Sequence, residues 1–203
     1  MSNDAAQRIA PGTTLVIALI VLAALSRLLP HPPNFTPVEA IGLFAGAWLA
    51  DRRLAFIVPL AAMALSDLII GLHSGMAVIY GLIAFNVWLG LRLGPNPGAL
   101  RVGGYGLLAA VVFFLVSNFA TWASGGGLGY TRDLAGLLAC YTAAIPFFQY
   151  TLAGMAVYAT LLFGGLRRRE GPDRSYAYNT AYLIDGEGDV LGTYDKTYLL
   201  MFG

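Results

Sequence analysis

The sequence predicts an all-α integral membrane protein with six transmembrane helices and a short C-terminal β-hairpin-like fragment. Hydrophobic residues make up 58% of the 203 positions and charged residues only 11%, whereas soluble domains carry about 25% charged residues. Six apolar runs follow one another, and the arginines fall almost entirely in alternate gaps between them. Lipid is therefore the expected solvent for most of the chain.

The six expected spans cover residues 13–29, 37–50, 54–70, 76–93, 102–122 and 134–164, separated by segments rich in proline and glycine. The first is long for a secretion signal and is interpreted as a retained span. The second is short, and Thr36, Pro37 and Glu39 match a capping box with Thr36 as the N-cap. The last is longer than a bilayer needs, so we expect it to bend at Pro146 or to lie partly at the interface.

The arginines predict the orientation of these spans. If both termini are cytoplasmic, the outer loops hold only Arg27 and Arg132, whereas eight arginines lie close to the spans on the cytoplasmic side: Arg8, Arg52, Arg53, Arg92, Arg101, Arg167, Arg168 and Arg169. A re-entrant second run would place Arg92 and Arg101 on the other side from Arg52 and remove the asymmetry. The pattern therefore favours six full crossings, with an N-terminal cytoplasmic segment (1–12), a transmembrane domain (13–166), a basic linker (167–174) and a C-terminal fragment (175–203).

Several classes of function lack their sequence signals. No G-x-x-x-x-G-K-[ST] phosphate loop occurs, so the chain cannot couple ATP hydrolysis by itself. No HExxH or CxxC spacing indicates a metal, no cofactor is expected, and no basic stripe indicates nucleic acid. Cys140 is the only cysteine and has no second thiol to pair with.

Small residues mark one face of the second span. Gly42, Gly46 and Ala50 are spaced by four, which allows another backbone to approach closely. Helix packing within the bundle is the favoured interpretation, and contact with a partner protein is the alternative.

Polar residues gather at the predicted outer side and suggest a solute pocket open to the outside. An ionisable group in hydrocarbon is costly, so it usually faces the bundle interior or water. The outer half and the outer loops contain Asn34 and Tyr130 and the five residues assigned to the pocket, which are Glu39, Asp67, His73, Asn118 and Trp122.

Four of the five pocket residues also have a structural explanation. Asp67 lies in the last turn of its helix, where a carboxylate is disfavoured, so it needs a partner; His73 is a candidate, and a hydrogen bond that orders the 71–75 loop is the alternative. The capping box alone would account for Glu39. His73 can be a surface residue, and Trp122 an ordinary interfacial residue.

Asn118 and Trp122 are four apart and could hydrogen-bond and stack on a solute. Asn86 and Gln149 lie deeper and are expected to bond between helices.

A family resemblance covers about residues 10–166. It is carried by SRLLPHPPNFTP (26–37), VPL (58–60), SDLIIGLH (66–73), NF (118–119), CY (140–141) and AIPFF (144–148). These stretches resemble an uncharacterised bacterial family of transport proteins, similar in span number to the S components of energy-coupling-factor transporters. The resemblance implies a six-helix protein in the bacterial plasma membrane that captures a small solute from outside, working with a transmembrane coupling subunit and ATPases. It identifies no solute.

The C-terminal residues carry a second resemblance. YNTA (178–181), LIDGEG (183–188) and YDKTYLLMFG (194–203) resemble the nitrilase-like domain of apolipoprotein N-acyltransferases, and 181–185 pairs naturally with 190–194 across a turn at 186–189. In that family a cysteine, a glutamate and a lysine share catalysis, and Lys196 matches the lysine.

The other two catalytic roles of that family are empty in this chain. The matching cysteine would lie beyond Gly203, Cys140 is upstream in a span, and membrane helix occupies the region expected to hold the glutamate. The arginine count also leaves this tail in the cytoplasm, whereas the acyltransferase domain faces the periplasm. We therefore expect a truncated, inactive fragment. Solute binding is the preferred function, acyl transfer is the alternative, and a membrane scaffold without a solute is the third possibility.

Overall fold

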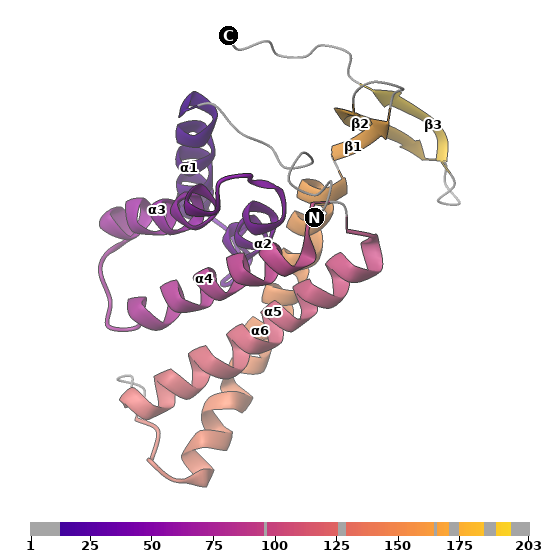
Figure 1. Cartoon of the computed structure of the whole chain (residues 1–203). Helices are drawn as coiled ribbons and strands as arrows, with labels where there is room; N and C mark the ends of the chain where they lie inside the picture. The colour runs from indigo at the N-terminus through magenta and orange to yellow at the C-terminus, as the bar shows by residue number, and fades with distance from the viewer. Residues whose placement is uncertain are drawn as a thin grey trace. The chain divides into compact units, whose positions relative to one another are not determined.

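The computed structural model describes residues 13–95, 97–125, 129–164, 166–170, 175–184 and 190–195. All six predicted apolar runs are helical: α1 is Thr13–Leu28, α2 Val38–Trp48, α3 Arg52–Ile70, α4 Met76–Leu93, α5 Ala99–Ser124 and α6 Leu134–Gly164 (Figure 1). Four of them, α3 to α6, are long and apolar enough to cross a membrane, which fits a membrane protein. The apolar helices α1 and α2 are shorter.

Neighbouring contacts show that the first four helices alternate in direction. Val16 at the start of α1 packs with Val58 in the first half of α3, and Arg27 at the end of α1 meets Asp67 near the end of α3, so these two helices are parallel. Val38 at the start of α2 packs with Met63 in the second half of α3, so α2 runs the opposite way. Consecutive helices are therefore antiparallel, as in an up-and-down bundle.

The central helix of this group is α2, whose residues are almost all buried and which packs most extensively on α4 (Figure 1). The two backbones touch at glycines. A Cβ on Gly46 would lie 2.1 Å from the carbonyl oxygen of Val87, and one on Gly90 would lie 2.1 Å from that of Leu43. The predicted small-residue face is thus confirmed as a packing face inside the chain, with Gly42 one turn earlier against Asn86.

The start and end of α2 differ from the prediction. Thr36 does not cap the helix: Pro37 occupies the N-cap without a side-chain cap hydrogen bond, and the capping box is wrong. The helix ends at Trp48, so the exposed Ala50 is not part of its small-residue face.

The helix α6 explains why the capping box does not form. The backbone of Phe35 and Thr36 lies 3.4 Å from the position that a Cβ on Gly154 would take, and the Phe35 ring packs on Tyr158 with centroids 5.4 Å apart. The segment before α2 is therefore held by tertiary contacts rather than by a local cap.

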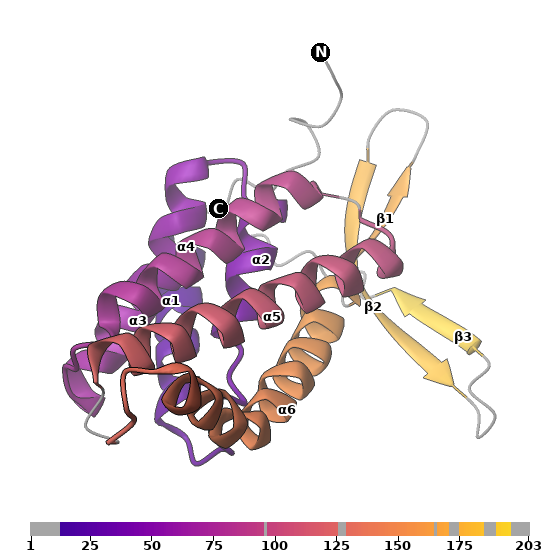
Figure 2. The same cartoon turned by 90° about the horizontal axis from the view of Figure 1, so that it is seen from below.

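The helices α5 and α6 associate through side chains and run antiparallel (Figure 2). Tyr141 donates a hydrogen bond of 2.7 Å to the carbonyl oxygen of Leu115, and Phe114 packs on Phe148 with centroids 4.6 Å apart. On its other side α5 lies along α4. The helices α4, α5 and α6 thus form a layer with α5 in the middle.

Contact clustering divides the chain into two compact units, Met1–Ala159 and Thr160–Gly203. In the second unit the backbone forms strands β1 (Leu166–Glu170), β2 (Ser175–Ile184) and β3 (Val190–Asp195) in the order β1-β2-β3. Both pairings are antiparallel, and Ala181 lies opposite Tyr194. The turn predicted at residues 186–189 lies outside the described residues, and the acyltransferase-like identity of this unit stays a prediction.

Candidate functional site

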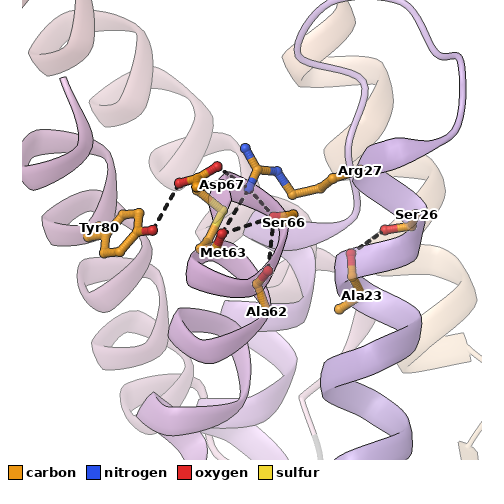
Figure 3. A network of polar contacts seen from close by, with 8 residues as sticks. All are labelled: Ala23, Ser26, Arg27, Ala62, Met63, Ser66, Asp67 and Tyr80. Carbon is orange, nitrogen blue, oxygen red and sulfur yellow. Dashed lines mark hydrogen bonds and ion pairs between the residues drawn. The ribbon is translucent and has the colours of Figure 1, made fainter. Parts of the chain in front are cut away.

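A buried ion pair joins α1 to α3. The guanidinium of Arg27 donates a 2.7 Å hydrogen bond to Oδ1 of Asp67, and the two side chains are 16% and 1% exposed (Figure 3). The last turn of α3 positions Asp67 at the end of its helix, where the helix dipole disfavours a carboxylate. The charge of Arg27 compensates for that cost, and Asp67 in turn neutralises Arg27, one of the two arginines predicted to lie outside.

Further hydrogen bonds extend this ion pair to α4. Tyr80 donates to Oδ2 of Asp67 at 2.9 Å, and Arg27 also donates to the hydroxyl of Ser66 and to the carbonyl oxygen of Met63 (Figure 3). The polar cluster of Arg27, Ser66, Asp67 and Tyr80 therefore ties three helices together at one end and leaves both carboxylate oxygens with partners.

The partner predicted for Asp67 is wrong. His73 is exposed in the loop after α3, where its ring approaches Gly75 rather than a carboxylate. Sequence reasoning missed Arg27 and Tyr80 as partners, since Arg27 lies 40 positions away from Asp67. One signal was available: the apolar runs 13–29 and 54–70 each contain a single charged residue, and each charge needs compensation.

A cavity of about 210 Å³ lies among α4, α5, α6 and the α1–α2 loop. Its polar lining residues are Asn34, Ser117, Asn118 and Thr151, and its apolar ones are Ile79, Phe113, Phe114, Ala144, Phe147 and Phe148. Asn34 takes a positive φ of 65°, a conformation that asparagine tolerates better than most residues. Among the described residues, no formally charged side chain lines this cavity, which we call the inner cavity.

Three polar groups of the inner cavity each donate one hydrogen bond to a carbonyl oxygen of their own helix. The Ser117 hydroxyl donates to the carbonyl oxygen of Phe113 at 2.6 Å, and the Asn118 amide donates to that of Phe114 at 2.7 Å. Thr151 donates to Phe147 at 3.3 Å. A side chain bonded in this way can still accept hydrogen bonds through its oxygen lone pairs. The cavity wall therefore combines acceptor oxygens with aromatic surface.

A second cavity, of about 300 Å³, adjoins the first along α4 and α5. Ile79 and Ser117 line both cavities, and the outer one is completed by His73, Ser74, Gly75, Val78, Ala120, Thr121 and Ser124. We call the two together the α4–α5 crevice. Of the five predicted pocket residues, the structure brings His73 and Asn118 to this crevice.

The remaining predicted pocket residues lie elsewhere. Asp67 belongs to the polar cluster with Arg27, and Glu39 is buried in the first turn of α2 with Oε2 lacking a partner. Trp122 donates its indole hydrogen to the carbonyl oxygen of Thr131 at 2.9 Å and packs on Phe119. Trp122 therefore fastens the end of α5 to the connection that leads into α6.

Asp133 lies in the same connection between α5 and α6, immediately before the first residue of α6. Its Oδ1 accepts hydrogen bonds of 2.7 Å from the backbone N–H of Gly136 and from the Thr131 hydroxyl. These bonds favour the ionised form and hold the pKa of Asp133 below its usual value. The arrangement is an N-cap, which satisfies a free N–H at the start of the helix.

The interhelical hydrogen bonds predicted for Asn86 and Gln149 are not seen. Asn86 is buried, but its Nδ2 lacks a hydrogen-bond partner among the described residues, and Gln149 is exposed. Across the described part of the chain, no group of three or more histidine, cysteine, aspartate and glutamate side chains could hold a metal ion.

The apolar helices and the α4–α5 crevice fit a helical membrane protein with room for a small molecule. The chain belongs to a family described as "Family of unknown function (DUF6580)", whose model matches residues 7–172. A search of curated proteins finds no match, and a search of solved structures finds none either.

Proposed function

We propose that this protein is a membrane-embedded binding component of a transport system that takes a small solute from the outer face. The observation that carries the proposal is the α4–α5 crevice, in which two adjoining cavities share Ile79 and Ser117. His73 lines the outer cavity, beside the α3–α4 loop, and Asn118 lines the inner cavity. Two adjoining cavities, one of them lined largely by aromatic side chains, suit capture of a small molecule.

The alternation of helix directions supports six crossings with both termini in the cytoplasm of a bacterial cell. The helix α2 runs parallel to α4 and antiparallel to α3, as a crossing segment at its place in the order must. Its 11 residues rise only about 16 Å, so the segment before it must also enter the membrane. The backbone of Phe35 and Thr36, just before α2, lies against Gly154 of α6. Irregular backbone is tolerated at membrane depth where protein covers it, so this contact supports the entry of the segment into the membrane.

The lining of the inner cavity indicates the kind of solute. Four phenylalanine rings offer stacking surface, and Ser117, Asn118 and Thr151 offer acceptor oxygens. An uncharged molecule with a flat apolar part and hydrogen-bond donors fits this lining, whereas a charged one would lack a counter-ion among the lining residues. The energy for transport would come from partners, a coupling subunit with ATPases, as the resemblance to S components implies.

The acyltransferase alternative depends on the C-terminal fragment. Lys196 lies outside the described residues, and no contact in the described part of the chain favours an acyl-transfer site. The fragment therefore adds no step to the proposed function.

Native purification followed by mass spectrometry of bound small molecules tests the proposal. Ser117→Leu places bulk between the two cavities and should abolish recovery of the bound compound. Gly81→Leu is the matched control, because a side chain at Gly81 on α4 would enter open space. A compound recovered equally from both variants, or from neither of them nor the wild type, would contradict the proposed site.

A further inference from the structure

Two buried carboxyl groups in the helical unit have opposite surroundings. Asp67 is 1% exposed and has Arg27 and Tyr80 as partners. Glu39 is 8% exposed, and its Oε2 has no hydrogen-bond partner among the described residues. Asp67 is therefore paired and Glu39 is not, and a buried carboxylate is stable only when it is paired.

Helical spacing places Glu39 on the face of α2 that packs on α4. Glu39 precedes Gly42 by three residues, which places the two on neighbouring positions of one helix face. Gly42 is the residue against which Asn86 packs, since a Cβ there would be 3.3 Å from the Asn86 Cβ. Asn86 is 1% exposed, and its Nδ2 also lacks a partner. One contact between two helices thus holds a buried acidic group and a buried amide, both with an unpartnered polar atom.

The charged and titratable groups on the helices around α2 do not neutralise Glu39. At the end of the bundle where α2 begins, Arg27, Asp67 and Tyr80 are bonded to one another. Arg52 starts α3, Arg92 ends α4, and Arg101 and Tyr105 start α5, all toward the other end of α2. Among the described residues the recorded ion pair is that of Arg27 with Asp67, and it does not include Glu39.

We propose that Glu39 is a proton-binding site inside the membrane domain. With the α2–α4 contact closed, Glu39 holds a proton and is a neutral carboxylic acid, since an unpaired carboxylate there would lose its hydration without compensation. When the contact opens and water enters, the O–H bond of the acid breaks, the proton passes to a water oxygen, and the carboxylate remains. Closure of α2 on α4 is thereby linked to proton uptake. The proposal does not depend on the nature of the solute.

Carbodiimide labelling of the full chain in lipid nanodiscs tests this site. Dicyclohexylcarbodiimide enters membranes and reacts with protonated carboxylic acids rather than with carboxylates, and peptide mass spectrometry locates the product. At neutral pH we expect the adduct on Glu39 and none on Asp67, which is the matched control in the same chain. Glu39→Gln, which keeps the size of the side chain, should remove the adduct.

Infrared spectroscopy gives an independent measurement that does not need reagent access. The carbonyl band of a protonated carboxylic acid should be present at neutral pH in the wild type and lost in Glu39→Gln. A band that survives this substitution would overturn the proposal, as would labelling of Asp67 instead of Glu39. Protection from the carbodiimide by sodium but not by choline would also overturn it, because the site would then bind a metal cation.

Discussion

The change Asp67→Asn removes the anionic partner of Arg27 while keeping the size of the side chain. Asp67 is 1% exposed, and Arg27 is 16% exposed, so water can replace little of the lost interaction. Breaking a buried ion pair by removing one partner costs about 3–5 kcal/mol. We expect a cost near 3 kcal/mol for Asp67→Asn, the lower end of this range, because the guanidinium retains some contact with solvent.

The reverse change, Arg27→Met, leaves the less exposed partner unpaired. We expect it to cost more than Asp67→Asn, toward about 5 kcal/mol. The double variant leaves neither charge behind, and Tyr80 can still donate to the oxygen of the new amide. Its cost should therefore be smaller than the sum of the single costs by about 2–3 kcal/mol, which is the coupling that a double-mutant cycle measures.

Reversible unfolding in mixed micelles with a rising fraction of sodium dodecyl sulfate, followed by circular dichroism, gives the four free energies of unfolding. The cluster in Figure 3 predicts strong coupling between the two positions. Additive effects, or single costs of less than about 1 kcal/mol as found for exposed ion pairs, would refute the reasoning that this pair is buried and holds α1 on α3.

Three further predictions concern the packing of the helices and their ends. Gly90→Ala should destabilise the fold by about 1–3 kcal/mol because the new methyl group would meet the Leu43 carbonyl oxygen. Gly81→Ala, where the methyl group enters open space, should be neutral or stabilising in the same unfolding assay. Equal changes in the free energy of unfolding for the two variants would contradict the close contact of Gly90 with α2. Tyr80→Phe should cost about 1.5–3 kcal/mol, as expected for a hydrogen bond to a charged group; no measurable change would exclude Tyr80 from the cluster. Asp133 has a lowered pKa in the folded state, so its contribution to stability should be full above the unfolded value of about 3.9 and lost as the pH falls through the folded pKa; an Asp133→Asn variant that loses as much stability on acidification as the wild type would contradict the role of Asp133 as the cap of α6.

Helix existence and helix ends were largely predictable because they depend on local physics. Apolar runs marked all six helices. Glycines predicted to interrupt the runs end three of them with positive φ, at Gly71 (120°), Gly94 (80°) and Gly125 (74°). A residue without a Cβ takes such a conformation at little cost, so these stops can be read from the sequence alone.

The capping box failed because distant contacts decided the local geometry. Thr36 and Glu39 have the right spacing, but α6 presents Gly154 to the backbone before α2 and Tyr158 to the ring of Phe35. These contacts join positions more than a hundred residues apart. A four-residue pattern carries no information about them.

The candidate site was predictable only in part for a similar reason. Asn118 and His73 could be singled out because polar residues are rare in the spans. The phenylalanines of the inner cavity could not, since an aromatic residue that faces lipid and one that lines a cavity look the same in an apolar run. The pairing of Asp67 with Arg27 required knowing that α1 lies along α3, which the sequence does not state.

The direction in which α2 is proposed to cross the membrane is the most direct test of the account, because the proposed outward-facing crevice requires an even number of crossings. Single cysteines at His31, Ala50 and Ser124, each in a Cys140→Ala background, report the α1–α2, α2–α3 and α5–α6 connections to an impermeant thiol reagent. We predict labelling of His31→Cys and Ser124→Cys from outside the cell and of Ala50→Cys only after the membrane is opened. Labelling of His31→Cys and Ala50→Cys from the same side would contradict the six-crossing arrangement and the outer location of the crevice.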